Sequence, residues 1–183
     1  MQGLARNHGF NTPCIDYYVN NRDEVLNRLS EITGEEKGTI KVALLAIVYG
    51  ANLYYQGDIR ELLSDGYDSF SSDEEVKALY KEVRDVGRFI INLEGQKTQR
   101  EHFVNILDKS VPYIQQNFGS MLSHILQGYE AKIMHLVIEK HSDKISLLLH
   151  DGYIFKEEID VREIEQDIKE QIGLDITMTI ESC

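Results

Sequence analysis

The chain contains little proline and little cysteine. Only two of each occur among its 183 residues. Cys14 and Cys183 lie near opposite ends and have no metal-ligand spacing, so the sequence predicts no role for cysteine chemistry. With 42% hydrophobic and 27% charged residues, the composition is that of a folded globular protein. The length predicts one domain, or one core with an attached helical lobe.

Long hydrophobic runs are missing as well. The longest apolar stretch, Val42 to Tyr49, is far too short to cross a bilayer. The first residues also lack the charged-then-apolar pattern of a secretion signal. We therefore expect an intracellular, cytoplasmic protein that makes no contact with a membrane.

Positive charge is scarce relative to negative charge. The formal net charge is −12 at pH 7, which argues against a general nucleic-acid coat protein because phosphate contacts need clustered Lys and Arg. The acidic excess is concentrated after residue 100, where 15 Asp and Glu accompany 7 Lys and Arg. A nucleic-acid contact is therefore expected in the first third of the chain, which is nearly balanced.

Hydrophobic periodicity predicts a mostly helical chain. Apolar residues recur at steps of three and four, with Thr12-Pro13 and Asp160 as helix starts and Gly34 and Gly173 as helix ends. Runs rich in Ile, Leu and aromatic residues flank Asp151-Gly152, which is a strong hairpin signal. The predicted elements are helices over 12–33 (with a break at 20–21), 35–50, 76–95, 120–141 and 160–172, a hairpin over 144–155 and a half-buried strand over 175–181.

The order of these elements divides the chain into two regions. Residues 1–119 are expected to form a helical region, with short helix and loop over 52–73 and a polar link before residue 120. Residues 120–183 are expected to fold as helix, hairpin, helix and strand. Helices that back a small antiparallel sheet make an α+β fold.

The predicted helix over 35–50 carries the first candidate site. Lys37 and Lys41 lie one turn apart on one face, and Tyr49 follows within about 80 degrees of that face. Two ammonium groups in line can hold a triphosphate, and an aromatic ring further along can stack on a base. The alternative is an amphipathic helix with two solvated lysines and a core tyrosine.

The predicted hairpin carries the second candidate site. An aspartate at its tip, Asp151, would project from a rigid apolar ribbon toward a divalent cation, with His150 beside it. The alternative is a turn in which Asp-Gly serves only the backbone. A third candidate is the polar stripe of His124, Gln127 and Glu130 on the helix before the hairpin, and such a stripe is usually a solvated face.

The order of these motifs resembles the family A polymerases, which include the DNA polymerase I-like enzymes and the single-subunit RNA polymerases of phages and mitochondria. The helix called motif B in that family typically reads Arg-x3-Lys-x7-Tyr-Gly. Lys37, Lys41, Tyr49 and Gly50 match it with one Arg-to-Lys change. This is the more specific of the matches.

Two further elements match downstream, in the family's order. His150-Asp151 resembles motif C, the hairpin that bears a metal-binding aspartate. Gln127-Gly128 resembles the template-contacting pair that precedes motif C in the DNA enzymes. The resemblance implies a helical fingers-like lobe over 1–119 and a palm-like region with a small antiparallel sheet over 120–183.

The resemblance implies template-directed nucleotidyl transfer assisted by two metal ions, Mg²⁺ or Mn²⁺. Asp151 would hold metal, with His150 beside it in the catalytic hairpin. Lys41 would grip the incoming nucleoside triphosphate with help from Lys37, and Tyr49-Gly50 would lie at the sugar and template base. The implied partners are nucleoside triphosphates and a nucleic-acid template with its primer or nascent strand, which Gln127-Gly128 would contact.

The sequence departs from the family pattern at two points. The family's first metal-binding aspartate usually precedes the motif B lysine by some fifty or more residues, and only forty precede Lys41, so Asp16 is too close. Gly152 also replaces the usual Glu or Ser after the hairpin aspartate. The resemblance thus implies a fragment, a half of a split polymerase that needs an upstream subunit, or a decayed relative.

The identity of the product stays open, because Leu45 favours an RNA polymerase and Gln127-Gly128 favours a DNA polymerase. A single aspartate holds a metal ion weakly, so no robust synthesis is expected from this chain alone. Two other functions remain open: a non-catalytic helical interaction module, and an inactive polymerase relative that binds nucleic acid or a partner subunit.

Overall fold

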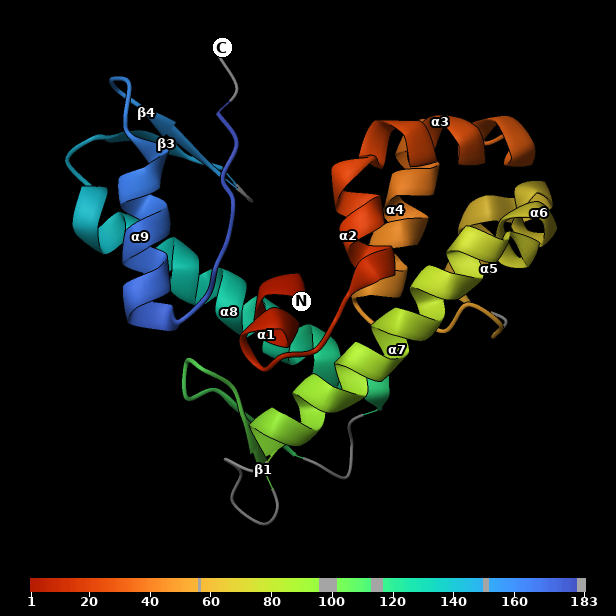
Figure 1. Ribbon diagram of the computed structural model, residues 1–183, viewed down its shortest axis with the longest axis horizontal. Helices are drawn as coiled ribbons and strands as arrows, with labels where there is room; N and C mark the ends of the chain where they lie inside the picture. The colour runs from red at the N-terminus through yellow and green to blue at the C-terminus, as the bar shows by residue number, and fades with distance from the viewer. Residues whose placement is uncertain (56, 96–101, 113–116, 150–151, 181–183) are drawn as a thin grey trace.

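The computed structural model describes residues 1–55, 57–95, 102–112, 117–149 and 152–180. These residues form a mostly helical α+β structure with two separate two-stranded antiparallel sheets, so the predicted fold class is confirmed in this coarse form. Figure 1 shows two arms that diverge from a common base in the shape of a V.

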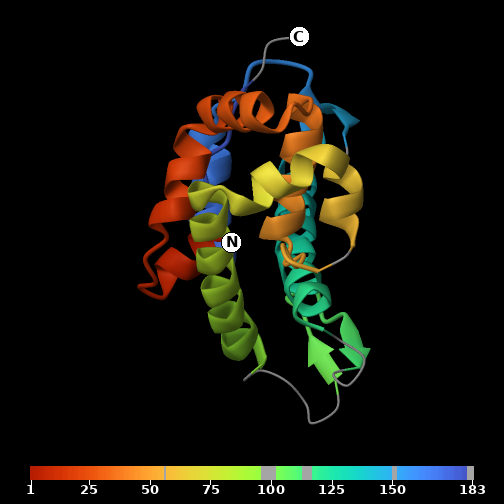
Figure 2. The ribbon, with the colours of Figure 1, turned by 90° about the vertical axis from the view of Figure 1, so that its right-hand side faces the viewer.

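The first arm consists of helices from the N-terminal half. Its buried face is lined almost wholly by Leu, Ile, Val and Phe side chains, and α7 runs along the arm down to the base (Figures 1 and 2). The short helix α1 lies at the base, beside α7. The bounds are α1 Gln2–Asn7, α2 Pro13–Asn20, α3 Arg22–Thr33, α4 Lys37–Val48, α5 Asp58–Leu63, the 3-10 helix η1 Ser64–Gly66, α6 Tyr67–Ser72 and α7 Glu74–Gly95.

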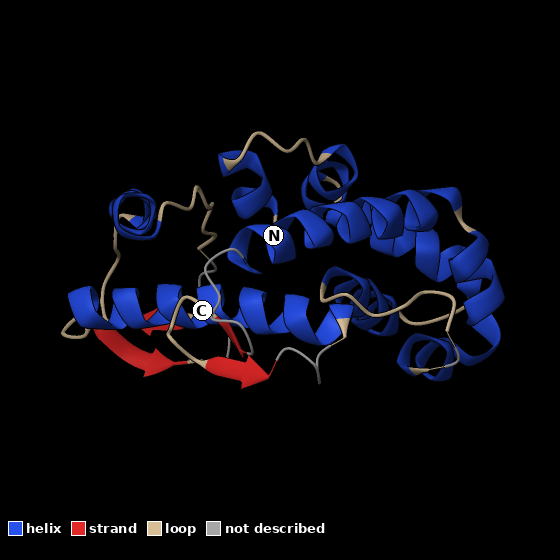
Figure 3. Ribbon diagram, turned by 90° about the horizontal axis from the view of Figure 1, so that it is seen from below, coloured by secondary structure: helices blue, strands red, loops and turns tan. Residues whose placement is uncertain are grey.

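The second arm is built on the long helix α8, which begins at the base and contacts α7 there. Helix α9 packs on the far half of α8, and a hairpin lies beside them (Figure 3). A second hairpin, β1–β2, lies at the base. The bounds are β1 His102–Val104, β2 Ser110–Pro112, α8 Phe118–His141, β3 Ile145–Leu148, β4 Tyr153–Phe155 and α9 Val161–Ile172.

The predicted helix boundaries are confirmed at several points. The first predicted helix is broken at Asn21, which separates α2 from α3, and Gly34 ends α3 with a φ of 76°. Asp160 caps α9 by accepting the Arg162 N–H at 3.0 Å, and Gly173 ends that helix with a φ of 75°. Side-chain caps and left-handed end residues are local devices, and the sequence shows them directly.

The predicted polar link before residue 120 is wrong in part, because β1 and β2 occupy 102–104 and 110–112. The buried Asn105 organises the turn between them. Its Oδ1 accepts the N–H groups of Leu107 at 3.0 Å and Lys109 at 3.2 Å, while Phe103 is fully buried. Strands of three residues are too short to show an alternating pattern.

The predicted strand over 175–181 is also wrong, because residues 175–180 form no strand and residue 181 lies outside the described part of the chain. Leu174 is buried, and Ile176 and Met178 pack against the core, so one face of the segment is half-buried as expected. The Met178 N–H donates to the Glu165 carboxylate at 2.7 Å instead of to a strand. The alternation therefore reflects packing on helices rather than a β-ladder.

Close backbone contact joins the two arms at the base. Gly50, just after α4, has a φ of 91°, and a Cβ placed on it would lie 2.8 Å from the Gly119 Cα of α8. A Cβ on Gly87 of α7 would lie 2.6 Å from the ring of Phe118. The Arg84 guanidinium lies 3.7 Å from the centre of that ring. We call Gly50, Gly87, Phe118 and Gly119 the glycine junction.

Replacing Gly50→Ala should lower the free energy of unfolding by about 3 kcal/mol. The new side chain meets a left-handed backbone and the Gly119 main chain together. Gly38→Ala is the matched control, because Gly38 lies in α4 with open space around it, and helix propensity should raise stability there by about 0.5 kcal/mol. Urea unfolding followed by circular dichroism measures the stability of both variants. Equal changes in the two would contradict the claim that Gly50 packs directly against Gly119.

Candidate functional site

Helix α4 presents its two lysines to solvent. Its apolar residues, among them Ile40, Leu44 and Ile47, are buried against the neighbouring helices α3 and α7. Lys37 and Lys41 consequently lie on the opposite, exposed side. Neither lysine forms a hydrogen bond or ion pair with any residue that the structure describes. Both positive charges are therefore available to a ligand.

The first turn of α4 adds to this positive end. The helix begins at Lys37, and no described side chain caps its first N–H groups. Free N–H groups at a helix start carry partial positive charge and favour anions. The N-cap residue Glu36 is exposed and opposes this effect. Glu35 directly precedes Glu36, so two carboxylates accompany the two lysines, and phosphate binding here would depend on the lysine side chains and the free N–H groups rather than on net charge.

Tyr49, at the other end of α4, is tied to α8. Its hydroxyl donates to the Glu130 carboxylate, and its carbonyl accepts from the Ser123 hydroxyl at 3.0 Å. Burial raises the pKa of the Tyr49 phenol above its usual value, and the hydrogen bond and charge of Glu130 raise it further. The Tyr49 ring packs against the core, and both lysines are exposed, so the alternative of two solvated lysines and a core tyrosine stays open.

Ser123 and Glu130 were not recognised as partners of Tyr49 from the sequence. They are seven residues apart, which places them on the same face of α8. The sequence indicated Glu130 only as part of a polar stripe on its helix, and nothing in the sequence marked Ser123 as a partner of Tyr49. Burial lowers the pKa of the Met1 amino group, whereas the nearby Glu130 carboxylate opposes that change. Glu130, a residue of α8, thus interacts both with Tyr49 at the end of α4 and with the amino group of Met1.

The polar stripe of α8 divides into three different environments. His124 Nε2 lies 3.2 Å from the Lys109 carbonyl, and its ring packs edge-on against Phe103. Glu130 binds Tyr49, as described above. Gln127 is exposed and has no partner among the described residues. Of the three, Gln127 alone is free to meet a ligand.

Gly128 has a packing role. It is buried, and a Cβ placed on it would lie 2.7 Å from Asn105 Nδ2 in the β1–β2 turn. The Asn105 amide in turn donates to the His124 carbonyl at 3.4 Å. A template contact by the predicted pair Gln127-Gly128 therefore rests on the Gln127 side chain.

His150 and Asp151 lie outside the described residues, so their side chains have no described geometry. The hairpin on either side is described and confirms the predicted antiparallel pair. Leu148 is the register partner of Tyr153, and the Leu149 N–H donates to the Gly152 carbonyl at 3.0 Å. Hairpin strands thus flank the two predicted residues on both sides.

Within the described ranges, no three His, Cys, Asp or Glu side chains gather as a metal site. Two described carboxylates are also engaged in other contacts, since Glu130 accepts from Tyr49 and Asp16 pairs with Arg6 at 2.8 Å. The residues that are described therefore do not by themselves fit a divalent ion. Metal binding stays a prediction for Asp151.

Comparison with known proteins adds no relative, because no protein-family model, curated protein or solved structure matches the chain. The resemblance to family A polymerases therefore rests on the residues themselves. Among the helices that the structure describes, none has the length and apolar character needed to cross a membrane.

A double-mutant cycle should detect the bond between Tyr49 and Glu130. Tyr49→Phe and Glu130→Gln remove the same charge-assisted hydrogen bond, so their effects on the free energy of unfolding should couple by about 1 kcal/mol. Because Glu130 helps raise the phenol pKa, the coupling should be fully present at pH 7, begin to fall above the unfolded tyrosine pKa of about 10, and disappear only as the pH passes the raised pKa of the folded state.

The control cycle pairs Tyr49→Phe with Glu139→Gln, an exposed glutamate further along α8. That pair should show no coupling at any pH. Urea titrations of the single and double variants give each value, and equal coupling in the two cycles would mean that Glu130 is not the partner of Tyr49.

Proposed function

We propose that the chain is the nucleotide-binding part of a template-directed nucleotidyltransferase, a DNA or RNA polymerase related to family A. In this proposal the first arm corresponds to the fingers-like lobe, and the arm of α8, α9 and β3–β4 corresponds to the palm-like region. The chain would complete its active site together with an upstream polymerase segment or subunit.

The observation that supports the proposal is the contact between the end of the motif B-like helix and α8, the helix that bears Gln127. Tyr49 and Gly50 end the helix that resembles motif B, and they contact Glu130, Ser123 and Gly119 on the helix that bears Gln127. Roughly seventy to eighty residues of sequence separate these contacts. The fold thus holds the end of the motif B-like helix against the helix that precedes the β3–β4 hairpin.

The exposed side of α4 supports a role in triphosphate binding. Lys37 and Lys41 lie one turn apart on a helix whose start has free N–H groups. A triphosphate offers several charged oxygens in a row, so two ammonium groups at this spacing can each form a charge-assisted hydrogen bond. Tyr49 limits how the far end of the helix can move, because its hydroxyl and carbonyl are both bound to α8.

Asp151 would contribute the metal-binding carboxylate of the active site, with His150 beside it. A bound Mg²⁺ or Mn²⁺ would supply charge stabilisation during phosphoryl transfer. A lone carboxylate needs further oxygen ligands, which the nucleotide and a second polymerase segment would provide.

The second candidate is a binding module without catalytic activity, and the β3–β4 hairpin favours it. Leu147, Leu148 and Leu149 are 54%, 50% and 45% exposed, an apolar run on a two-stranded ribbon. Such a surface is typical of a protein contact. An inactive polymerase relative that binds a partner subunit would combine this contact with the lysines of α4.

Lys41→Ala should weaken the binding of a Mg²⁺-bound nucleoside triphosphate about tenfold, the effect of losing one charge-assisted hydrogen bond. Lys81→Ala is the control. Lys81 is also an exposed lysine of the first arm, on α7, so its replacement removes the same charge from that arm. Fluorescence anisotropy with a labelled triphosphate and the whole chain gives the affinities.

A loss of affinity confined to Lys41→Ala supports the proposal. Equal losses in the two variants would indicate attraction to net charge alone and contradict it. A wild-type chain that binds no triphosphate but self-associates through Leu147–Leu149 would favour the binding module instead.

Asp151→Asn should abolish the binding of Mn²⁺ to the protein, measured without added nucleotide. The amide keeps the size of the side chain but removes the charge that attracts the ion. Asp143→Asn is the control, because Asp143 is an exposed aspartate just before the same hairpin. Electron paramagnetic resonance of free Mn²⁺ measures the bound fraction, and identical binding by wild type and Asp151→Asn would remove Asp151 from the site.

A further inference from the structure

A cavity of about 180 Å³ lies within the first arm, among α2, α3, α4 and α7. It is separate from the exposed lysines of α4, and the residues proposed to bind nucleotide do not line it. Its floor consists of apolar side chains that are almost fully buried: Leu29, Leu44, Val76 and Leu79. Exposed residues also belong to the lining, so the cavity opens to solvent on one side.

The volume limits what the cavity can hold. An engineered apolar cavity of about 150 Å³ stays dry and binds benzene. The present cavity is slightly larger, so it accommodates one aromatic ring with a small substituent or a fused second ring. A nucleoside triphosphate or a stretch of peptide chain is too large to enter.

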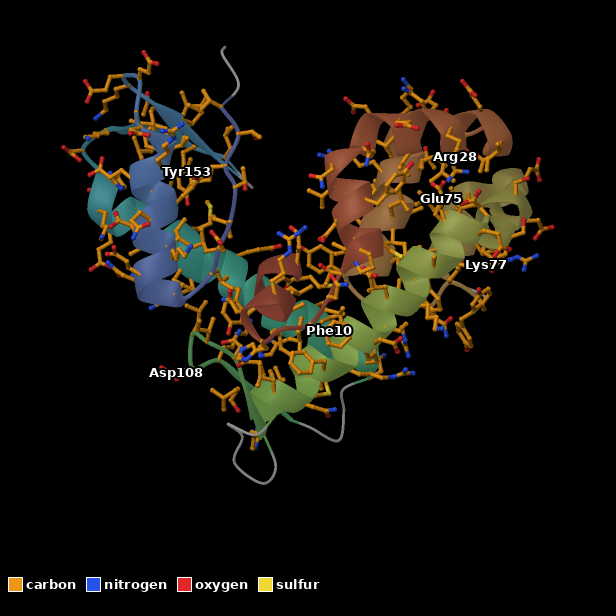
Figure 4. The ribbon with its side chains drawn as sticks, viewed as in Figure 1. Phe10, Arg28, Glu75, Lys77, Asp108 and Tyr153 are labelled. Atoms are coloured by element: carbon orange, nitrogen blue, oxygen red, sulfur yellow. The ribbon has the colours of Figure 1, made fainter. Side chains whose placement is uncertain are left out.

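The rim of the cavity includes the half-buried Arg28 and the exposed Glu75. Arg28 is bound to the Asp73 carboxylate at 2.6 and 3.1 Å and to the Glu75 carboxylate at 2.7 Å. Figure 4 shows Arg28 and Glu75 together on the upper part of the arm. Arg28 and Glu75 are the charged residues in the lining and they neutralise each other, so the otherwise apolar lining disfavours a charged ligand.

The remaining lining favours an aromatic ligand over an aliphatic one. The rings of Tyr17 and Tyr18 line the cavity, and aromatic pairs gain energy from edge-to-face or offset contact. Cys14 also belongs to the lining, and a sulfur atom can contact an aromatic ring favourably. The Arg28 guanidinium at the rim can lie over a ring face.

We propose that this cavity binds a single aromatic ring system of a small uncharged molecule, of the size of phenol or indole. The site is additional to the proposed nucleotide site and does not depend on it. Because Leu44 belongs to the helix that carries Lys41, a bound ring contacts the back of that helix.

The test uses the whole chain and indole as the probe. Indole should shift the methyl NMR signals of Leu29, Leu44 and Val76 in a saturable way. Ala78→Phe places a ring over the mouth, because Ala78 is an exposed residue of α7 in the lining, and it should weaken indole binding at least tenfold. Ala131→Phe, at an exposed position of α8 outside the lining, should bind indole as wild type does.

A second readout does not require a blocked variant to fold. In a Cys183→Ser chain, Cys14 is the remaining thiol, and its alkylation by iodoacetamide reports access to the cavity. Burial raises the pKa of this thiol and the Glu82 carboxylate raises it further, so the rate is measured near pH 9. Saturating indole should slow alkylation at least fivefold.

Three outcomes would overturn the proposal. The first is an affinity for indole that Ala78→Phe leaves within twofold of wild type. The second is equal affinity for cyclohexanol or benzoate, which are comparable in size but aliphatic and anionic respectively. The third is an alkylation rate of Cys14 that indole does not change.

Discussion

At the base of the V, the main chain of Gly50 lies directly against Gly119 with no side chain between them. Gly87 of α7 leaves the space into which the Phe118 ring fits. The Arg84 guanidinium lies over the face of the same ring. Helices approach this closely only where a Cβ is missing. The course of α8, and with it the position of the second arm, therefore depends on the glycine junction.

The polar contacts of the candidate site depend on the same junction. Tyr49 precedes Gly50, so the close backbone approach brings the Tyr49 carbonyl and hydroxyl within reach of Ser123 and Glu130. The lysines of α4 stay exposed because the apolar side of that helix is buried in the first arm. One helix thus has a tethered end beside α8 and a free, lysine-bearing end in solvent.

Most of the helices could be predicted from the sequence because their signals are local. Each of these signals acts within one turn of the chain: the helix break at Asn21, the cap at Asp160 and the helix ends at Gly34 and Gly173. The β3–β4 hairpin was also predicted, from its turn residues, whereas the β1–β2 hairpin and the C-terminal segment were not, because their packing depends on partners from elsewhere in the chain. Ile176 and Met178 alternate as a strand does, yet the neighbours that the fold supplies are helices and the Glu165 carboxylate.

By itself the sequence determined the α+β class, the apolar face of α4 and hence the exposure of Lys37 and Lys41, since a 3.6-residue period sets which side is buried. Only the tertiary structure decided that Tyr49 binds Glu130, that Gly128 packs on Asn105 and that α2, α3, α4 and α7 enclose a cavity. These features join residues far apart in the chain. Their contacts depend on how whole helices meet, and no local pattern of residues encodes that.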